Sequence, residues 1–114
     1  MGVVRVKDGV EFKVIAPGGF RILRAIDTVA DKCSVDLTIT SGTDGMHSGP
    51  DDPHHRGEAY DIRSQNLGPT TKETVLNALR SLLDATGRFY TFLEAEATSN
   101  EHFHAQVKRG TTFP

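Results

Sequence analysis

Alternating hydrophobic and polar residues mark several stretches of the chain as strands. Residues 10–16 (VEFKVIA) place apolar side chains at every second position, with charged residues between them. Residues 35–42 (VDLTITSG) alternate in the same way, and residues 59–63 (AYDIR) form a shorter candidate. A period of two residues is typical of a strand that buries one face. Two further strands are predicted near the C-terminus, at residues 88–97 and 102–110.

Two other stretches carry apolar residues at helical spacing. In residues 20–33 the apolar positions recur every three or four residues, and charged residues occupy the other face. The Pro-Gly-Gly sequence at residues 17–19 is expected to end the preceding strand. Residues 68–87 contain a second apolar stripe, with Thr70 and Glu73 at the spacing of a capping box. We therefore predict two amphipathic helices.

Residues 42–58 separate the second and third predicted strands and contain four glycines, two prolines and three aspartates. This composition predicts a loop, and a loop of this length in a compact domain is usually functional or disordered. The elements follow the order strand, helix, strand, loop, strand, helix, strand, strand. This order favours an α+β fold, a small mainly antiparallel sheet with two helices packed on one face and the long loop at the active-site edge. With 114 residues, the chain is expected to form a single domain, residues 1–114.

Composition and charge narrow the classes of partner. The formal net charge is −2, with acidic and basic residues interspersed, so no basic patch predicts binding to nucleic acid or to an anionic membrane. No apolar stretch approaches the roughly 20 residues that span a bilayer, and residues 1–30 do not resemble a signal peptide. We expect a monomeric protein that is synthesised in the cytoplasm. Cys33 is the only cysteine, which excludes an intrachain disulfide.

Four of the five histidines lie in two short stretches, HHRGEAYDIRS at residues 54–64 and NEHFHAQV at residues 100–107. Surface histidines are common, and their number alone would more often indicate solvated residues than metal ligands. The spacing is more informative, because a catalytic zinc typically takes three nitrogen or oxygen ligands and leaves a fourth position to water. His54 and Asp61 could supply two ligands from the first stretch, and His104 could supply the third.

The residues around these three suit a metal site. Gly57 lets the backbone turn back, and Ala59 leaves room for a metal and its substrate above the chain. Glu101, three residues before His104, could receive a proton from zinc-bound water as a general base. Two histidines, one carboxylate and a free glutamate are the groups that a zinc hydrolase needs.

The pattern His54-x-x-Gly57-x-Ala59-x-Asp61, followed by Glu101-x-x-His104, resembles the signature of the zinc D-alanyl-D-alanine carboxypeptidases. Relatives of that family include D-Ala-D-Ala dipeptidases, phage L-alanyl-D-glutamate endopeptidases and the hedgehog signalling domain. The resemblance covers residues 41–104 and implies a small α+β fold.

The resemblance also implies an activity and a set of roles. His54, Asp61 and His104 would hold one Zn²⁺ per chain, and Glu101 would be the base. The substrate would be a peptide bond next to a D-amino acid in the stem peptides of bacterial peptidoglycan, cut by a carboxypeptidase or an endopeptidase. Zinc-bound hydroxide would attack the carbonyl directly, without an acyl-enzyme. The absence of a signal peptide would fit a phage or prophage lytic enzyme that reaches the cell wall after release or export.

Two departures from the family pattern concern the substrate. Many members carry an arginine shortly after Ser41 and Gly42, and here that role is vacant or filled by His47, Arg63 or His102. In addition, an aspartate stands two residues before His54, where family members often have a serine. These changes leave open an alternative function, a non-catalytic zinc-binding member that binds a peptide or protein partner, and a third reading, a purely structural zinc site.

Neighbouring residues leave further alternatives. His55 competes with His54 for the ligand position, although the spacing to Asp61 favours His54. His102 shares a face with His104 in a regular strand and could reach the site as an oxyanion donor or a supporting group.

The same alternation places Glu101 on the opposite face unless the strand begins at about residue 102. In a strand that is regular through residue 101, Glu94 or Glu96 would be the substitute base. His47, Ser41 and Arg63 are the predicted substrate contacts.

Overall fold

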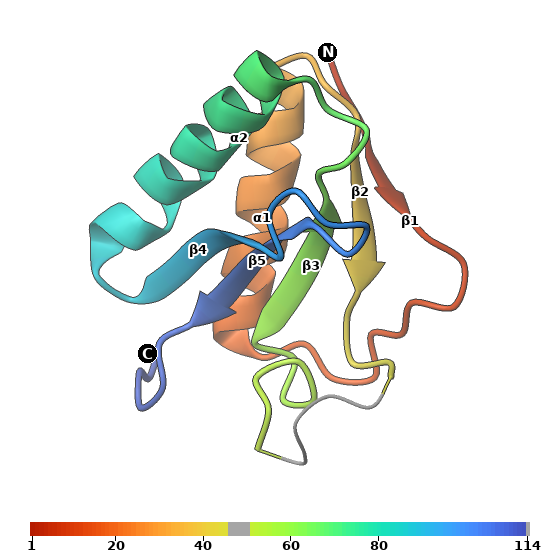
Figure 1. Ribbon diagram of the computed structural model, residues 1–114. Coiled ribbons are helices and arrows are strands. Elements are labelled where there is room, and N and C mark those ends of the chain that lie inside the picture. The colour runs from red at the N-terminus through yellow and green to blue at the C-terminus, as the bar shows by residue number, and fades with distance from the viewer. Residues whose placement is uncertain (46–50, 114) are drawn as a thin grey trace.

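A five-stranded sheet in the order β1-β2-β3-β5-β4 carries two helices on one of its faces (Figure 1). This computed structural model describes residues 1–45 and 51–113. The strands are β1 (Val4–Val6), β2 (Leu37–Ser41), β3 (Ala59–Arg63), β4 (Phe89–Glu94) and β5 (His102–Val107). The helices are α1 (Pro17–Lys32) and α2 (Pro69–Leu82), and a short 3-10 helix, η1 (Asp84–Thr86), follows α2. β1 pairs with β2 in parallel, and the other pairings are antiparallel. The predicted α+β fold is confirmed.

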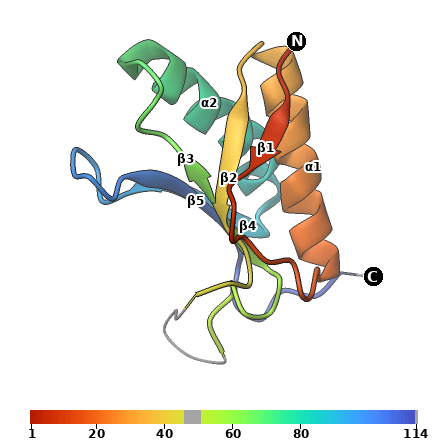
Figure 2. The ribbon, with the colours of Figure 1, turned by 90° about the vertical axis from the view of Figure 1, so that its right-hand side faces the viewer.

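One hydrophobic core lies between the sheet and the helices. Figure 2 shows the sheet nearly edge-on, with α1 along one side of it. Both helices contribute fully buried residues, among them Ile22 and Ile26 of α1 and Leu79 of α2, which belong to one cluster with strand residues such as Tyr60 and Phe103. The hydrophobic effect of this burial therefore holds both helices on the same face. Neither helix within the described ranges combines the length and apolar character that crossing a bilayer would require.

The two faces of the sheet differ in chemistry because successive strand residues point to opposite sides. Tyr60 and Ile62 of β3 enter the core, so Asp61 and Arg63 lie on the face away from the helices. In β5, Phe103, Ala105 and Val107 enter the core in the same way. The antiparallel register pairs Asp61 with His104 and Arg63 with His102. The polar residues of the two strands are thus brought side by side on the open face.

The strand predicted at residues 10–16 is wrong, because the first strand is β1 and residues 10–16 lie outside the sheet. The extended segment is instead bonded to the loop after β2. Glu11 N donates to Asp44 Oδ1 over 2.9 Å, and Lys13 N donates to Thr43 Oγ1 over 3.0 Å. Its alternating pattern reflects Val10 and Phe12, which are half-buried and pack against the core without belonging to a strand.

The helix boundaries also differ in part from the prediction. α1 begins at Pro17 rather than at residue 20, since proline is favoured at the first helical position, where its missing N–H is not needed. Phe20, an apolar position of the predicted stripe, instead lies on the outer face of α1 and is 59% exposed. α2 forms where predicted, but its N-cap is Gly68 and no side chain caps it, so the capping box is absent. The predicted strand at residues 88–97 ends at Glu94.

Candidate metal centre

The three predicted ligands converge on the open face of the sheet. His54 comes from the turn before β3, Asp61 from the middle of β3 and His104 from the middle of β5. One ligand atom from each lies within 4.8 Å of the other two. Asp61 Oδ1 is 3.2 Å from His54 Nε2 and 2.9 Å from His104 Nδ1. Donor atoms bound to one tetrahedral zinc at about 2.0–2.1 Å lie roughly 3.3 Å apart, so these separations are close to those of a metal site.

His54 is oriented by the loop that follows β2. Its Nδ1 lies 3.1 Å from the carbonyl oxygen of Gly42, which can only accept a hydrogen bond. Nδ1 therefore donates to this carbonyl, and the ring turns Nε2 toward Asp61. The backbone N–H of His54 donates to Asp52 Oδ1 over 2.9 Å. Asp52 thus fixes the backbone of the histidine.

His104 is oriented from its own strand. Its Nε2 lies 2.8 Å from Gln106 Oε1, so Nε2–H donates and Nδ1 faces Asp61. The ring of Phe92 on β4 packs against it, with centroids 5.0 Å apart. Partners of this kind fix the ring of a ligand histidine and the nitrogen that it presents.

Asp61 is the charged centre of the group. Burial alone would raise the pKa of its carboxyl, but hydrogen bonds from His104 and His54 and the nearby imidazoles outweigh burial and hold the pKa well below its usual range. Burial alone would lower the pKa of His104, yet its hydrogen bond to Asp61 raises it. Asp61 is thus held as a carboxylate that accepts hydrogen bonds from its histidine neighbours.

A second group of possible ligands adjoins the first. It consists of Asp61, Glu94 and His102. His102 Nε2 lies 2.9 Å from Glu94 Oε1 and 3.6 Å from Asp61 Oδ2. Its Nδ1 also lies 2.7 Å from the carbonyl oxygen of Asn100, so both ring nitrogens face hydrogen-bond acceptors. His102 therefore lies beside the ligands, as predicted. Glu94 lies next to His102 because the β4–β5 register pairs these two residues.

The carboxylate of Glu101, the predicted base, is held elsewhere. It lies 2.8 Å from Lys72 Nζ on α2 and accepts hydrogen bonds from Ser64 Oγ and Ala97 N. The hydrogen bond from Lys72, followed by those from Ser64 and Ala97, lowers the pKa of Glu101 to about 2. Glu101 belongs to neither of the two groups that could hold a metal among the described residues.

The metal group lines a hollow of about 360 Å³, together with Asp52, Glu94 and His102. Of the predicted substrate contacts, Ser41 and Arg63 line a neighbouring hollow, and His47 lies outside the described residues. His55, the competing ligand, is in neither metal group.

Sequence reasoning missed Gln106 as the partner of His104. Its position two residues after His104, on the same strand face, was the available signal.

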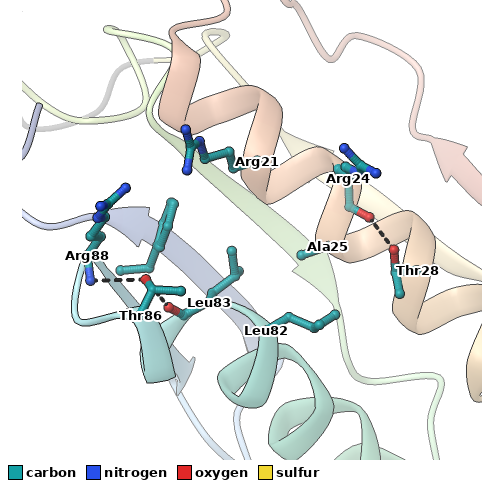
Figure 3. A pocket seen from close by; sticks show the side chains of 9 residues that line it. Arg21, Arg24, Ala25, Thr28, Leu82, Leu83, Thr86 and Arg88 are labelled. Carbon is teal, nitrogen blue, oxygen red and sulfur yellow. Dashed lines mark hydrogen bonds between the residues drawn. The ribbon is translucent and has the colours of Figure 1, made fainter. Parts of the chain in front are cut away.

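A cavity of about 440 Å³ on the helix side of the molecule has a different character (Figure 3). It lies between α1 and the end of α2, with arginines such as Arg21 and Arg88 around an apolar floor that includes Ala25 and Leu83. Its lining contains no histidine, cysteine or carboxylate. It therefore offers no metal ligand and no general base, and the chemistry of the described residues is concentrated on the opposite face.

The described residues thus include a group of two buried histidines and one half-buried carboxylate that could hold a metal ion. No family model matches the chain, and neither a curated protein nor a solved structure matches it with significance.

Proposed function

We propose that this protein is a zinc-dependent peptidase that hydrolyses peptide bonds next to D-amino acids in peptidoglycan stem peptides. The observation that carries the proposal is the convergence of two buried histidines, His54 and His104, with the half-buried Asp61 at a hollow on the polar face of the sheet. The resemblance of their spacing to the zinc D-alanyl-D-alanine carboxypeptidases supplies the substrate class.

The donor set fits zinc. Two imidazole nitrogens and one carboxylate oxygen are typical of catalytic zinc, whereas magnesium and calcium prefer sites made entirely of oxygen. Each histidine also has its second ring nitrogen engaged, as ligand histidines usually do. When bound, zinc would polarise the substrate carbonyl and make water a nucleophile at neutral pH.

Glu94 is the carboxylate best placed to move the proton in this arrangement. Its Oε1 lies 3.5 Å from His104 Nδ1, and its side chain is 42% exposed, open to the hollow. Glu94 would accept a proton from the attacking water and deliver it to the leaving amine. His102, 2.9 Å away, orients this carboxylate. Glu101 stays a prediction as the base, and in that role its carboxylate would first have to leave Lys72.

The test is digestion of purified peptidoglycan by zinc-loaded protein, with and without a chelator, followed by mass spectrometry of the released peptides. Fragments that end at a D-amino acid bond, and that are absent with chelator and with His104→Ala, would support the proposal. An absence of fragments from walls of every peptide type would exclude it.

The engagement of Glu101 by Lys72 favours a second candidate, a zinc-binding module that holds a peptide without cutting it. In that case zinc-loaded protein would bind stem peptides and release no fragments in the same experiment.

A further inference from the structure

A second hollow adjoins the metal centre on the same face of the sheet. It measures about 390 Å³ and shares Asp61, Asn100 and His102 with the hollow around the metal group. Much of the remaining wall is uncharged and polar, formed by Thr40, Ser41, Gln65 and Ser99. Hydroxyl and amide groups of this kind suit the backbone of a peptide that continues past the metal centre.

Two cations line this second hollow. Lys7 follows β1, and Arg63 is the last residue of β3. Within residues 1–45 and 51–113, neither side chain forms an ion pair. The two carboxylates in the lining are already engaged, Asp61 by imidazoles and Glu101 by Lys72. The hollow therefore contains positive charge without a matching anion, in a chain whose formal net charge is −2.

The spacing of these cations suits a short peptide. Arg63 lies two residues after Asp61 on the same strand face, roughly 7 Å at the usual rise of a strand. Lys7 approaches from the other side of β2, two strand spacings or roughly 10 Å from β3. An extended peptide covers the shorter of these distances in about two residues.

We propose that Lys7 and Arg63 bind a carboxylate of the substrate, one or two residues from the bond that lies at the metal centre. The guanidinium of Arg63 can engage both oxygens, and the ammonium of Lys7 adds a second charge. The identification of the ligand as a stem peptide rests on the proposed function, whereas the charge pairing does not.

Binding of matched acid and amide ligands to the whole chain tests the subsite, by isothermal titration calorimetry in the zinc-loaded and zinc-free states. One pair is N-acetyl-D-alanyl-D-alanine and its C-terminal amide. The other is N-acetyl-L-alanyl-D-glutamate and the corresponding D-isoglutamine peptide. At least one acid should bind about tenfold more tightly than its amide, because a hydrogen-bonded charge is lost in the amide, and added salt should reduce the difference.

The variants K7Q and R63Q should each reduce this acid preference, because they weaken binding of the acid more than binding of the amide. R24Q, on α1 at the helix side, is the matched control and should retain the preference. Equal binding of acid and amide in both pairs, no binding of any of the four ligands, or an unchanged preference in the K7Q/R63Q double variant would overturn the proposal. Because the readout is affinity, a protein that cuts no peptidoglycan can still show the preference, and an active peptidase can lack it.

Discussion

Lys72 and Glu101 form an ion pair that joins α2 to the residue preceding β5, with 2.8 Å between Nζ and Oε2. The side chain of Glu101 is 4% exposed, and Ser64, directly after β3, donates to the same carboxylate oxygen. Three elements therefore meet at one carboxylate. Removing one partner of a buried pair leaves the other charge uncompensated, which is the costly case.

The pair makes stability depend on pH at the acidic end. The pKa of Glu101 falls from 4.5 to about 2 on folding, so between these values the unfolded chain binds more protons than the native one. The contribution of the Glu101 carboxylate to the free energy of unfolding is complete above pH 4.5 and is lost as the pH falls toward 2. Urea midpoints measured from pH 2.5 to 7 should show a weaker acid dependence for E101Q than for the parent protein. E73Q, at an exposed position of α2, should follow the parent, and parallel curves for E101Q and the parent would contradict the role of the pair.

Glutamine variants at positions 94 and 101 separate the two candidate bases. E94Q should keep zinc and lose turnover by about 10²–10⁴-fold, the usual contribution of a positioned general base. E101Q should be less stable than the parent protein but should retain activity at temperatures where it is folded. Initial rates on a stem peptide show which glutamate is the base, and zinc content and circular dichroism serve as controls. A folded but inactive E101Q beside an active E94Q would return the role to Glu101.

Zinc content should follow the three ligands. H54A and H104A should lose the single equivalent bound by the parent after loading, and D61N should bind it more weakly because the charge is gone. H55A, next to the site, should bind normally. Q106L removes only the partner of His104 Nε2 and should weaken zinc binding by about 10–100-fold. Atomic emission and competition with a chelating dye measure these effects, and full zinc retention by both H54A and H104A would exclude the site.

Gly57 should tolerate no side chain. Its φ is +68°, and a Cβ would overlap the carbonyl oxygen of Val14. G57A should therefore lower the free energy of unfolding by about 1–3 kcal/mol or more, the usual cost of a strained backbone. G110A has a similar φ of +82° and open space around it, so it isolates the backbone cost alone. If chemical denaturation gives equal losses for the two variants, contact with Val14 has no part in the requirement for glycine.

The parts of the structure that the sequence predicted best are those with strong local periodicity. α2, β3 and β5 each follow from their own residues, because one face of each is apolar and enters the core. β1 was missed because it has only three residues and pairs in parallel with a strand about thirty positions away. The pattern at residues 10–16 was misleading for a related reason, since this segment bonds to the loop after β2 and not to a strand.

The metal ligands could likewise be predicted from local sequence, whereas the residues around them could not. The spacing between His54 and Asp61 is local, and Gly57 forms the turn that makes it effective. The partnership of Glu101 with Lys72 joins two distant elements and leaves no mark in the local pattern. Lys7 reaches the polar face only through the pairing of β1 with β2, so no motif around the histidines could have indicated it.

The position of β1 at the rim of the sheet has a consequence for self-association. An unpaired strand edge is a template on which a second chain can add a strand and start an aggregate. β1 offers only three residues for such pairing, and Arg5 and Lys7 stand on either side of the half-exposed Val6. Short length and flanking charge are the means by which natural sheets keep an edge from joining another molecule. Lys7, which we assign to carboxylate binding, therefore also disfavours the addition of further chains at this edge and the growth of a fibre.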